Sequence, residues 1–181
     1  MKKFVNISII SVLLLLICSC SAPKAKNEGY ALYRSSPVGV EIEYPDFWEM
    51  TDDKTKRIVA FAAPNEGFAD TFRDNVTIMS EDIGTDEFAY DDYVVEYIDK
   101  LPQTISEYNK LSEEELTVGE CRAYQIAYEG KTTDGNLRLC QTFIQSGRYV
   151  YIYTFMAEPA SYDYFNNNSK TMLSTFKPLR K

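Results

Sequence analysis

The stretch RYVYIYTFMA, residues 148–157, alternates aromatic rings with smaller side chains. Successive side chains of a β-strand point to opposite faces of the sheet, so a period of two predicts a strand. One face would carry Tyr149, Tyr151, Tyr153 and Phe155, and the other Val150, Ile152, Thr154 and Met156. A strand that is apolar on both faces is typical of the middle of a sheet with further structure on each side.

Two more strands are predicted directly before this stretch. NLRLCQTFIQSG (136–147) leads into it through a Ser-Gly turn, and LTVGECRAYQIAYEG (116–130) precedes that strand across a second short turn. Short turns connect antiparallel neighbours, and Gly119 indicates an interruption within the 116–130 segment. Alternating or continuously apolar residues predict earlier strands at 30–34, 38–45, 57–64 and 75–83.

Between these two groups of strands the hydrophobic period changes. In YDDYVVEYIDKL, residues 90–101, apolar residues recur at the spacing of one helical face. We expect a cap at Thr85 or Asp86 and an end at Pro102. A last helix is predicted after Ser161. The order strands, helix, strands, helix predicts an α+β fold, an antiparallel β-sheet flanked by helices.

The N-terminus has the three parts of an export signal. Lys2 and Lys3 precede an apolar run from about Ile9 to Ile17, and small residues follow the run. A transmembrane helix needs roughly 20 apolar residues to cross about 30 Å of hydrocarbon. Because this run is shorter, we interpret it as a signal peptide and not as a membrane span.

The residues after the run resemble the lipobox of bacterial lipoproteins. In that pattern an aliphatic residue three positions before a cysteine and a small residue one position before it precede the lipidated cysteine. Cys20 fits, with Ile17 and Ser19 in these places, whereas Cys18 would put the large Ile17 directly before the cut. The resemblance implies a lipoprotein signal peptide at 1–19 and a diacylglyceryl group on Cys20, which would hold the protein at the extracytoplasmic face of a bacterial cell membrane. The alternative is an ordinary secretory signal with an unmodified Cys20.

Residues 20–29 are predicted to be the lipidated cysteine and a flexible linker, and residues 30–181 the folded domain. The linker SAPKAKNEG lacks apolar periodicity and can span about 17 Å as a coil. Removing 1–19 takes away two of the 19 basic residues and none of the 27 acidic ones, which leaves a net charge of −10. Such a charge disfavours nucleic acid and anionic lipid surfaces as partners.

No pattern in the chain predicts an enzyme, a cofactor or a metal site. There is no histidine, which excludes His-based triads, His general bases and most zinc ligand sets. G-x-S-x-G, S-x-x-K, the phosphate-binding loop and the dinucleotide fingerprint are absent, and the acidic clusters lack the spacing of an EF-hand. A hydrolase that uses two of the 27 acidic side chains stays open as a less favoured alternative.

Besides the lipidated Cys20, Cys121 and Cys140 are the cysteines expected to remain after processing. The predicted hairpin places Cys121 opposite Ile144 and Cys140 opposite Gln125. The two cysteines are then roughly 13 Å out of register, whereas a disulfide needs Cα atoms within about 7 Å. We therefore expect two buried thiols, although a loop of different geometry would allow a bridge.

Several anchor residues and the order of the elements resemble one known family. The anchors are YPDFW with Pro45 and Trp48, the DNVTI strand at 74–78, the strand that contains Arg138, and a final helix that closes on STFKP. Over roughly residues 32–178 this arrangement resembles the PsbP-like domains, which include the extrinsic P protein of photosystem II and bacterial lipoproteins of DcrB-like type. The resemblance implies an α/β/α sandwich and a role in binding or assembly. The metal-binding histidines of photosynthetic members have no counterpart here.

The candidate binding face consists of aromatic side chains on the 148–157 strand and on a nearby loop. These residues are Tyr149, Tyr151, Tyr153, Phe68 and Phe72. The tyrosines would form a platform for a sugar, a peptide or a partner protein, or would instead pack inside the core. Trp48 would line a pocket mouth with the two phenylalanines or cap the core. The favoured function is a non-enzymatic subunit that docks on another envelope protein, and the alternative is a receptor for a small peptide or glycan.

Overall fold

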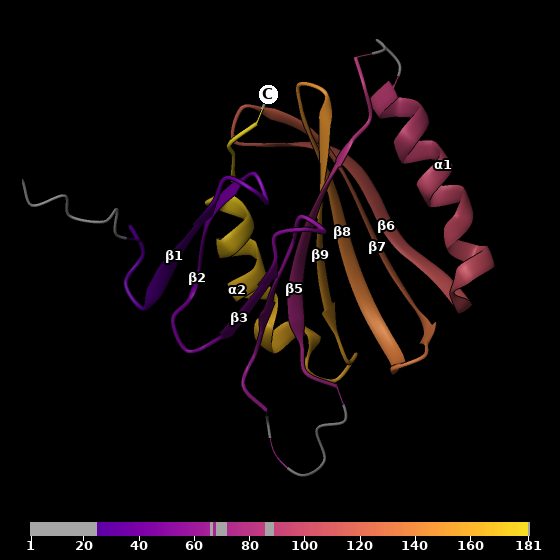
Figure 1. Cartoon of the computed structure of the whole chain (residues 1–181). Helices are drawn as coiled ribbons and strands as arrows, with labels where there is room; N and C mark the ends of the chain where they lie inside the picture. The colour runs from indigo at the N-terminus through magenta and orange to yellow at the C-terminus, as the bar shows by residue number, and fades with distance from the viewer. Residues whose placement is uncertain (1–24, 66, 68–71, 86–88, 181) are drawn as a thin grey trace, which may run out of the picture.

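The computed structural model describes residues 25–65, 67, 72–85 and 89–180. Within them the elements are β1 (Tyr30–Ser35), β2 (Val40–Pro45), β3 (Glu49–Asp53), β4 (Ile58–Ala62), β5 (Asn75–Asp82), α1 (Ala89–Thr104), β6 (Ser106–Val118), β7 (Cys121–Thr132), β8 (Gly135–Ser146), β9 (Tyr149–Ala157), α2 (Tyr162–Ser174) and β10 (Lys177–Pro178). They form two antiparallel sheets and two helices, which confirms the predicted α+β class (Figure 1).

The large sheet has the strand order β3-β4-β5-β9-β8-β7-β6, and every neighbouring pair is antiparallel. β9 lies in the middle, with Tyr153 opposite Ile78 of β5 on one side and opposite Thr142 of β8 on the other. This position follows from the apolar side chains on both faces of β9. The order also requires α1 to carry the chain from the middle of the sheet to its far edge at β6.

A small sheet of order β1-β2-β10 and helix α2 cover one face of the large sheet, and α1 covers the other. We call these the α2 face and the α1 face. Alternation along β9 divides its side chains between two hydrophobic clusters. Tyr151 and Tyr153 join the cluster on the α2 face, whereas Val150 and Ile152 join the one on the α1 face.

Helix α1 extends two residues beyond Pro102, so the predicted end at this proline is wrong. Proline lacks the amide hydrogen and its ring crowds the carbonyl four residues earlier, but this disturbance stays within the last turn of the helix. The amide of Ile105 donates to Leu101, and the Thr104 hydroxyl donates to Lys100, so the last carbonyls have partners. Asp86, one of the two residues expected to cap the start of this helix, lies outside the described residues.

Among the described helices, neither is long and apolar enough to cross a membrane.

Three strands were not predicted, namely β3, most of β6, and β10. β3 and β6 are largely exposed and polar, so they show no alternation of buried and exposed residues. β10 has only two residues and pairs with β2. These three edge strands therefore escaped a prediction that depends on burial.

The β7–β8 hairpin differs from the predicted register by two residues. Thr132 pairs with Gly135 across a tight two-residue turn, which puts Cys140 opposite Ala127. Cys121 starts β7 and pairs with Val118 of β6. The two cysteines are half-buried and are not joined by a disulfide, which confirms that part of the expectation.

Candidate functional site

The aromatic face of β9 is covered and does not form an exposed platform. Tyr151 and Tyr153 are 0% and 2% exposed, beneath the small sheet and α2. Their hydroxyls donate to the carbonyls of Gly39 and Ser169, each at 2.8 Å. Tyr149, at the end of the strand, is half-buried. The platform prediction is therefore corrected, because two of its three rings and their hydroxyls are already used inside the protein.

The other predicted aromatic residues do not come together. Phe68 lies outside the described residues. Phe72 packs on the cluster of the α1 face, whereas Trp48 is 4% exposed in the cluster of the α2 face, with its ring 5.6 Å from that of Phe165. Trp48 therefore caps the core, as the second of its two interpretations expected, and does not line a pocket with Phe72.

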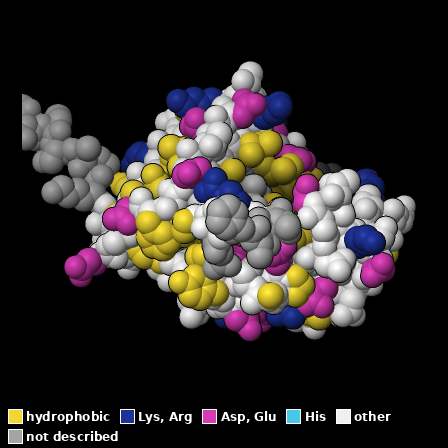
Figure 2. Space-filling model, turned by 90° about the horizontal axis from the view of Figure 1, so that it is seen from below, with side chains coloured by type: hydrophobic (Ala, Val, Ile, Leu, Met, Phe, Trp, Pro, Cys, Tyr) yellow, Lys and Arg dark blue, Asp and Glu magenta, His cyan; other side chains and the backbone are white. Residues whose placement is uncertain are grey.

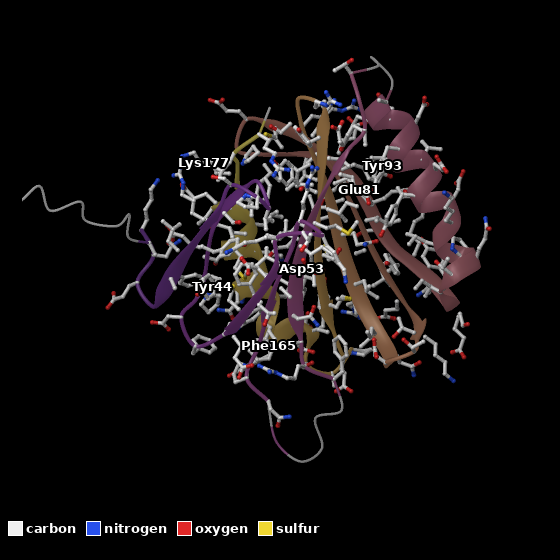
Figure 3. All side chains as sticks on the ribbon, in the orientation of Figure 1. Tyr44, Asp53, Glu81, Tyr93, Phe165 and Lys177 are labelled. Carbon is white, nitrogen blue, oxygen red and sulfur yellow. The ribbon has the colours of Figure 1, made fainter. Side chains whose placement is uncertain are left out.

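A hollow of about 420 Å³, the α1 hollow, lies between α1 and the end of β5. Tyr93 points from α1 toward Glu81 of β5, and its hydroxyl donates to the carboxylate at 2.9 Å (Figure 3). Burial and then this hydrogen bond raise the pKa of Tyr93 well above its usual value. Tyr93 thus stays a neutral donor that holds one wall of the hollow, and Lys100 lines the same space.

A buried polar network lies next to this hollow. The Gln141 amide accepts from the Tyr128 hydroxyl at 3.0 Å and donates to Tyr97 and Thr154, each at 3.2 Å. Gln141 is 5% exposed, so these hydrogen bonds replace the water that its amide loses on folding. The network joins α1 to three strands. The sequence did not predict this network, because a single glutamine in an apolar strand forms no recognisable pattern.

In the α1 hollow, Glu96 does not suit the general-acid role of a hydrolytic carboxylate pair. Glu81 and Glu96 both line the α1 hollow, but a hydrogen bond from Lys100 at 2.5 Å lowers the pKa of Glu96. A general acid needs the opposite change. Across the described part of the chain, no group of three or more carboxylates or cysteines could hold a metal ion.

A second hollow, the α2 hollow, has a volume of about 550 Å³ and lies between α2 and strands β6, β7 and β8. Ala127, Cys140 and Thr142 form part of its floor, and Leu116 and Leu173 lie on its sides. Burial raises the pKa of the Cys140 thiol to about 11. The thiol is therefore protonated at neutral pH and unsuited to nucleophilic chemistry.

On the other side of the same strands, a hollow of about 290 Å³, the β6 hollow, separates α1 from β6. Four carboxylates line it, those of Asp91, Asp99, Glu113 and Glu115. Arg122 is the lining residue that opposes them, with Nη2 2.8 Å from Asp91 and 3.5 Å from Glu115. This hollow is therefore acidic.

A shallow hollow of about 540 Å³ lies at the end of the domain that contains the start of α2. Phe47 and Tyr164, which are 57% and 72% exposed, lie on it together with the side chains of Asn65 and Asn168. Figure 2 views this end and shows hydrophobic side chains gathered on the surface there. Among the residues that the structure describes, the lining combines aromatic rings with amides and includes no charged side chain.

The segment before β1 is fastened to the small sheet by Glu43. One carboxylate oxygen accepts from the amide of Lys26 at 2.6 Å, and the other accepts from the amide and the side chain of Asn27 at 3.0 and 2.7 Å. Glu43 is 4% exposed. The end of the predicted flexible linker is therefore attached to the domain, whereas Cys20 lies outside the described residues.

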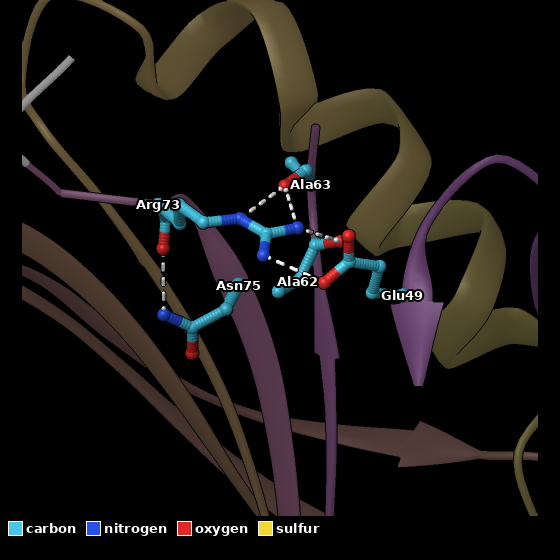
Figure 4. Close-up of polar contacts among 5 residues, drawn as sticks. All are labelled: Glu49, Ala62, Ala63, Arg73 and Asn75. Carbon is cyan, nitrogen blue, oxygen red and sulfur yellow. Dashed lines mark hydrogen bonds and ion pairs between the residues drawn. The ribbon is translucent and has the colours of Figure 1, made fainter. Parts of the chain in front are cut away.

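Arg73 attaches the end of the 65–74 loop to strands β3 and β4 (Figure 4). Its guanidinium donates to the Ala63 carbonyl at 2.9 and 2.7 Å and to Glu49 at 2.7 Å. Asn75 donates to the Arg73 carbonyl at 2.9 Å. These bonds give Arg73 a structural role, so it does not supply a free cation for an anionic ligand.

Comparison with known proteins gives similarities of fold. No family model and no curated protein sequence matches the chain. The solved structure of cyanobacterial PsbP (CyanoP) from Synechocystis sp. PCC 6803 matches with a TM-score of 0.61 and 14% identity, over 87% of this chain and 97% of that chain. PA94 from Pseudomonas aeruginosa, a protein of unknown function, matches with a TM-score of 0.60 and 21% identity, over 82% and 96%.

LpqN of Mycobacterium tuberculosis, described as involved in cell envelope biogenesis, matches with a TM-score of 0.55 and 11% identity, over 76% of this chain and 82% of that chain. At these identities the similarity concerns the fold alone. It confirms the predicted PsbP-like fold. The neighbours therefore guide a functional proposal but do not identify the protein.

Proposed function

We propose that this chain is a lipid-anchored extracytoplasmic protein that binds another protein of the cell envelope and catalyses no reaction. The lipobox pattern ending at Cys20 carries the proposal. The attachment of Lys26 and Asn27 to Glu43 supports it, because five residues then separate Cys20 from the first attached residue, and a chain of that length can reach at most about 20 Å. A domain on so short a tether stays close to the membrane surface.

The hollows support binding better than catalysis. Among the titratable groups that line them, the pKa of Cys140 is raised and the pKa values of Glu96 and Glu113 are lowered, in each case away from neutrality. Catalytic acids and bases usually have pKa values near the working pH. The similarity in fold to LpqN, described as involved in cell envelope biogenesis, agrees with a role in the same compartment.

The anchor is tested by changing the two neighbouring cysteines separately. We expect Cys20→Ala to move the protein from the membrane fraction to the soluble fraction, or to leave the signal peptide uncut. The matched change Cys18→Ala should leave membrane attachment unaltered, since Cys18 is removed with the signal. The measurements are fractionation and the mass of the N-terminal peptide. If Cys18→Ala lost lipidation and Cys20→Ala did not, the assigned cleavage site would be wrong by two residues.

Mild crosslinking followed by purification tests the binding role. A protein recovered in a fixed ratio to the chain would support docking. A second candidate function, retention of a small glycan, is favoured by the uncharged hollow between Phe47 and Tyr164, because sugars stack on aromatic rings and bond to amides such as Asn168. Repeated recovery of the chain without a protein, together with a bound oligosaccharide, would favour this second function.

A further inference from the structure

Strand β6 is an uncovered edge of the large sheet. Among the strands that the structure describes, it is the last in the order and pairs with β7 alone. Of its 13 residues, Val118 is buried and the others are exposed or half-exposed. In Figure 1 much of β6 lies on the opposite side of the molecule from β1, and its end runs across the top of the sheet toward α2 and the C-terminus. An edge strand offers a row of backbone donors and acceptors that an additional strand can use.

The charges on β6 restrict what can pair with it. Glu107, Glu113, Glu114 and Glu115 lie on the strand with one basic residue, Lys110. A second copy of β6 would place acidic side chains beside acidic side chains, which is unfavourable for cross-strand neighbours. A segment with lysine or arginine would instead meet opposite charges.

The two faces of β6 differ in character. Glu113 and Glu115 lie on the α1 face, where they line the acidic β6 hollow. Ser112 and Leu116 lie on the α2 face, where they line the α2 hollow. Leu111, at a shift in the β6–β7 register, is 44% exposed. An added strand projects alternate side chains to the two faces, so basic residues suit one face and apolar residues suit the other.

We propose that β6 pairs with an extended segment of a partner protein in which basic and apolar residues alternate, so that the segment becomes an eighth strand of the large sheet. The inference rests on the proposed function, because it states which kind of envelope protein the domain would bind. Main-chain hydrogen bonds supply the affinity in such strand addition, and the alternating side chains supply the specificity. The position of β6 away from the β1 side, where the tether is fastened, leaves the edge accessible to a partner.

The probe is a synthetic peptide of about ten residues that alternates lysine and valine, with blocked ends. It is titrated against the full lipidated chain in neutral detergent at low ionic strength. The two comparison peptides alternate glutamate and valine, or contain the same lysines and valines in two blocks. We expect the alternating lysine peptide to bind at least about tenfold more tightly than either, and to slow amide hydrogen exchange in Ser106–Val118.

Charge reversal on the strand supplies the matched variants. Glu113→Lys with Glu115→Lys should weaken binding of the lysine peptide by about tenfold or more. Glu28→Lys with Asp46→Lys changes the net charge equally on the exposed surface near β1, and should change binding by less than about twofold. Circular dichroism checks the fold of each variant. If the first pair does not fold, the single change Glu114→Lys on the exposed edge replaces it.

Three results would overturn the proposal. Binding of the lysine peptide without slower exchange in β6 would show attraction by charge alone. Equal binding of the glutamate peptide would exclude the charge argument. If amide exchange in β6 became slower with rising protein concentration in the absence of peptide, the strand would pair with a second copy of the chain. Membrane fractionation of Cys20→Ala does not involve β6, so failure here is distinguishable from failure of the proposed anchor.

Discussion

At the scale of single residues, Glu43 joins the chain before β1 to the small sheet. Its buried carboxylate accepts three hydrogen bonds from Lys26 and Asn27. Glu43→Gln keeps the size of the side chain but removes the charge, so we expect the free energy of unfolding to fall by about 1–3 kcal/mol. Urea unfolding measures this loss. Amide exchange at Lys26 and Asn27 should become faster in the same variant.

The dependence on pH supplies the control for this prediction. Burial acts to raise the pKa of Glu43, but the hydrogen bonds from Lys26 and Asn27 outweigh it and lower the pKa below 4.5. A lowered folded-state pKa means that the ionised carboxylate stabilises the fold above the unfolded value, and that this stability is lost as pH falls through the folded value. The difference between wild type and Glu43→Gln should therefore shrink in acid. A difference that stays constant from about pH 7 to pH 3 would contradict the assignment.

The same residues show which parts of a site can be predicted from the sequence. Alternation placed Tyr151 and Tyr153 on one face of a strand correctly, because the period of a strand is local. Whether that face is exposed depends on α2 and the small sheet, which approach it from distant parts of the chain. The contact between Glu43 and Lys26 is also a tertiary contact of one polar residue, and no periodic pattern reports it.

At the scale of elements, the passage from α1 into β6 depends on Gly130 of β7. A Cβ atom at this position would lie 2.2 Å from Cγ2 of Ile105 and 3.1 Å from the carbonyl oxygen of Ser106. Gly130→Ala should therefore lower the free energy of unfolding by about 1–3 kcal/mol, because either the helix end or the start of β6 must move. Thermal or urea unfolding measures the change.

A double mutant separates this clash from a general effect of alanine at Gly130. Ile105→Ala removes the nearest atom, so it should cost less in the Gly130→Ala background than in the wild type, with a coupling of about 1 kcal/mol. Additive losses would mean that the two positions do not interact, and that the passage tolerates a side chain at residue 130.

Elements that bury at least one face were predictable, and the others were not. β9 and α1 have clear periods because their side chains alternate between different environments. β6 is polar along most of its length and is held in the sheet by its pairing with β7, so its sequence resembled a loop. Pro102 misled the prediction because the hydrogen bond from the amide of Ile105 to the carbonyl of Leu101 continues the last turn past the proline.

At the scale of the whole molecule, β9 belongs to both hydrophobic clusters. Its side chains Tyr151 and Tyr153 pack with the small sheet and α2, and Val150 and Ile152 pack with α1. If either cluster unfolds, β9 loses the packing on one of its faces, and the other cluster is weakened as well. We therefore expect the two sheets and both helices to unfold in one cooperative transition.

Trp48 allows this cooperativity to be tested, because it is the only tryptophan of the chain and lies in the cluster of the α2 face. Ile152→Ala removes a buried side chain on the opposite face, at a cost of about 2–5 kcal/mol. In one cooperative unit, the urea midpoint seen by Trp48 fluorescence should fall as much as the midpoint seen by far-ultraviolet circular dichroism. Val95→Ala, on the exposed side of α1, should shift both by less than about 0.5 kcal/mol. If Ile152→Ala shifted the circular dichroism midpoint but left the Trp48 midpoint unchanged, the α1 face would unfold independently and β9 would not couple the two clusters.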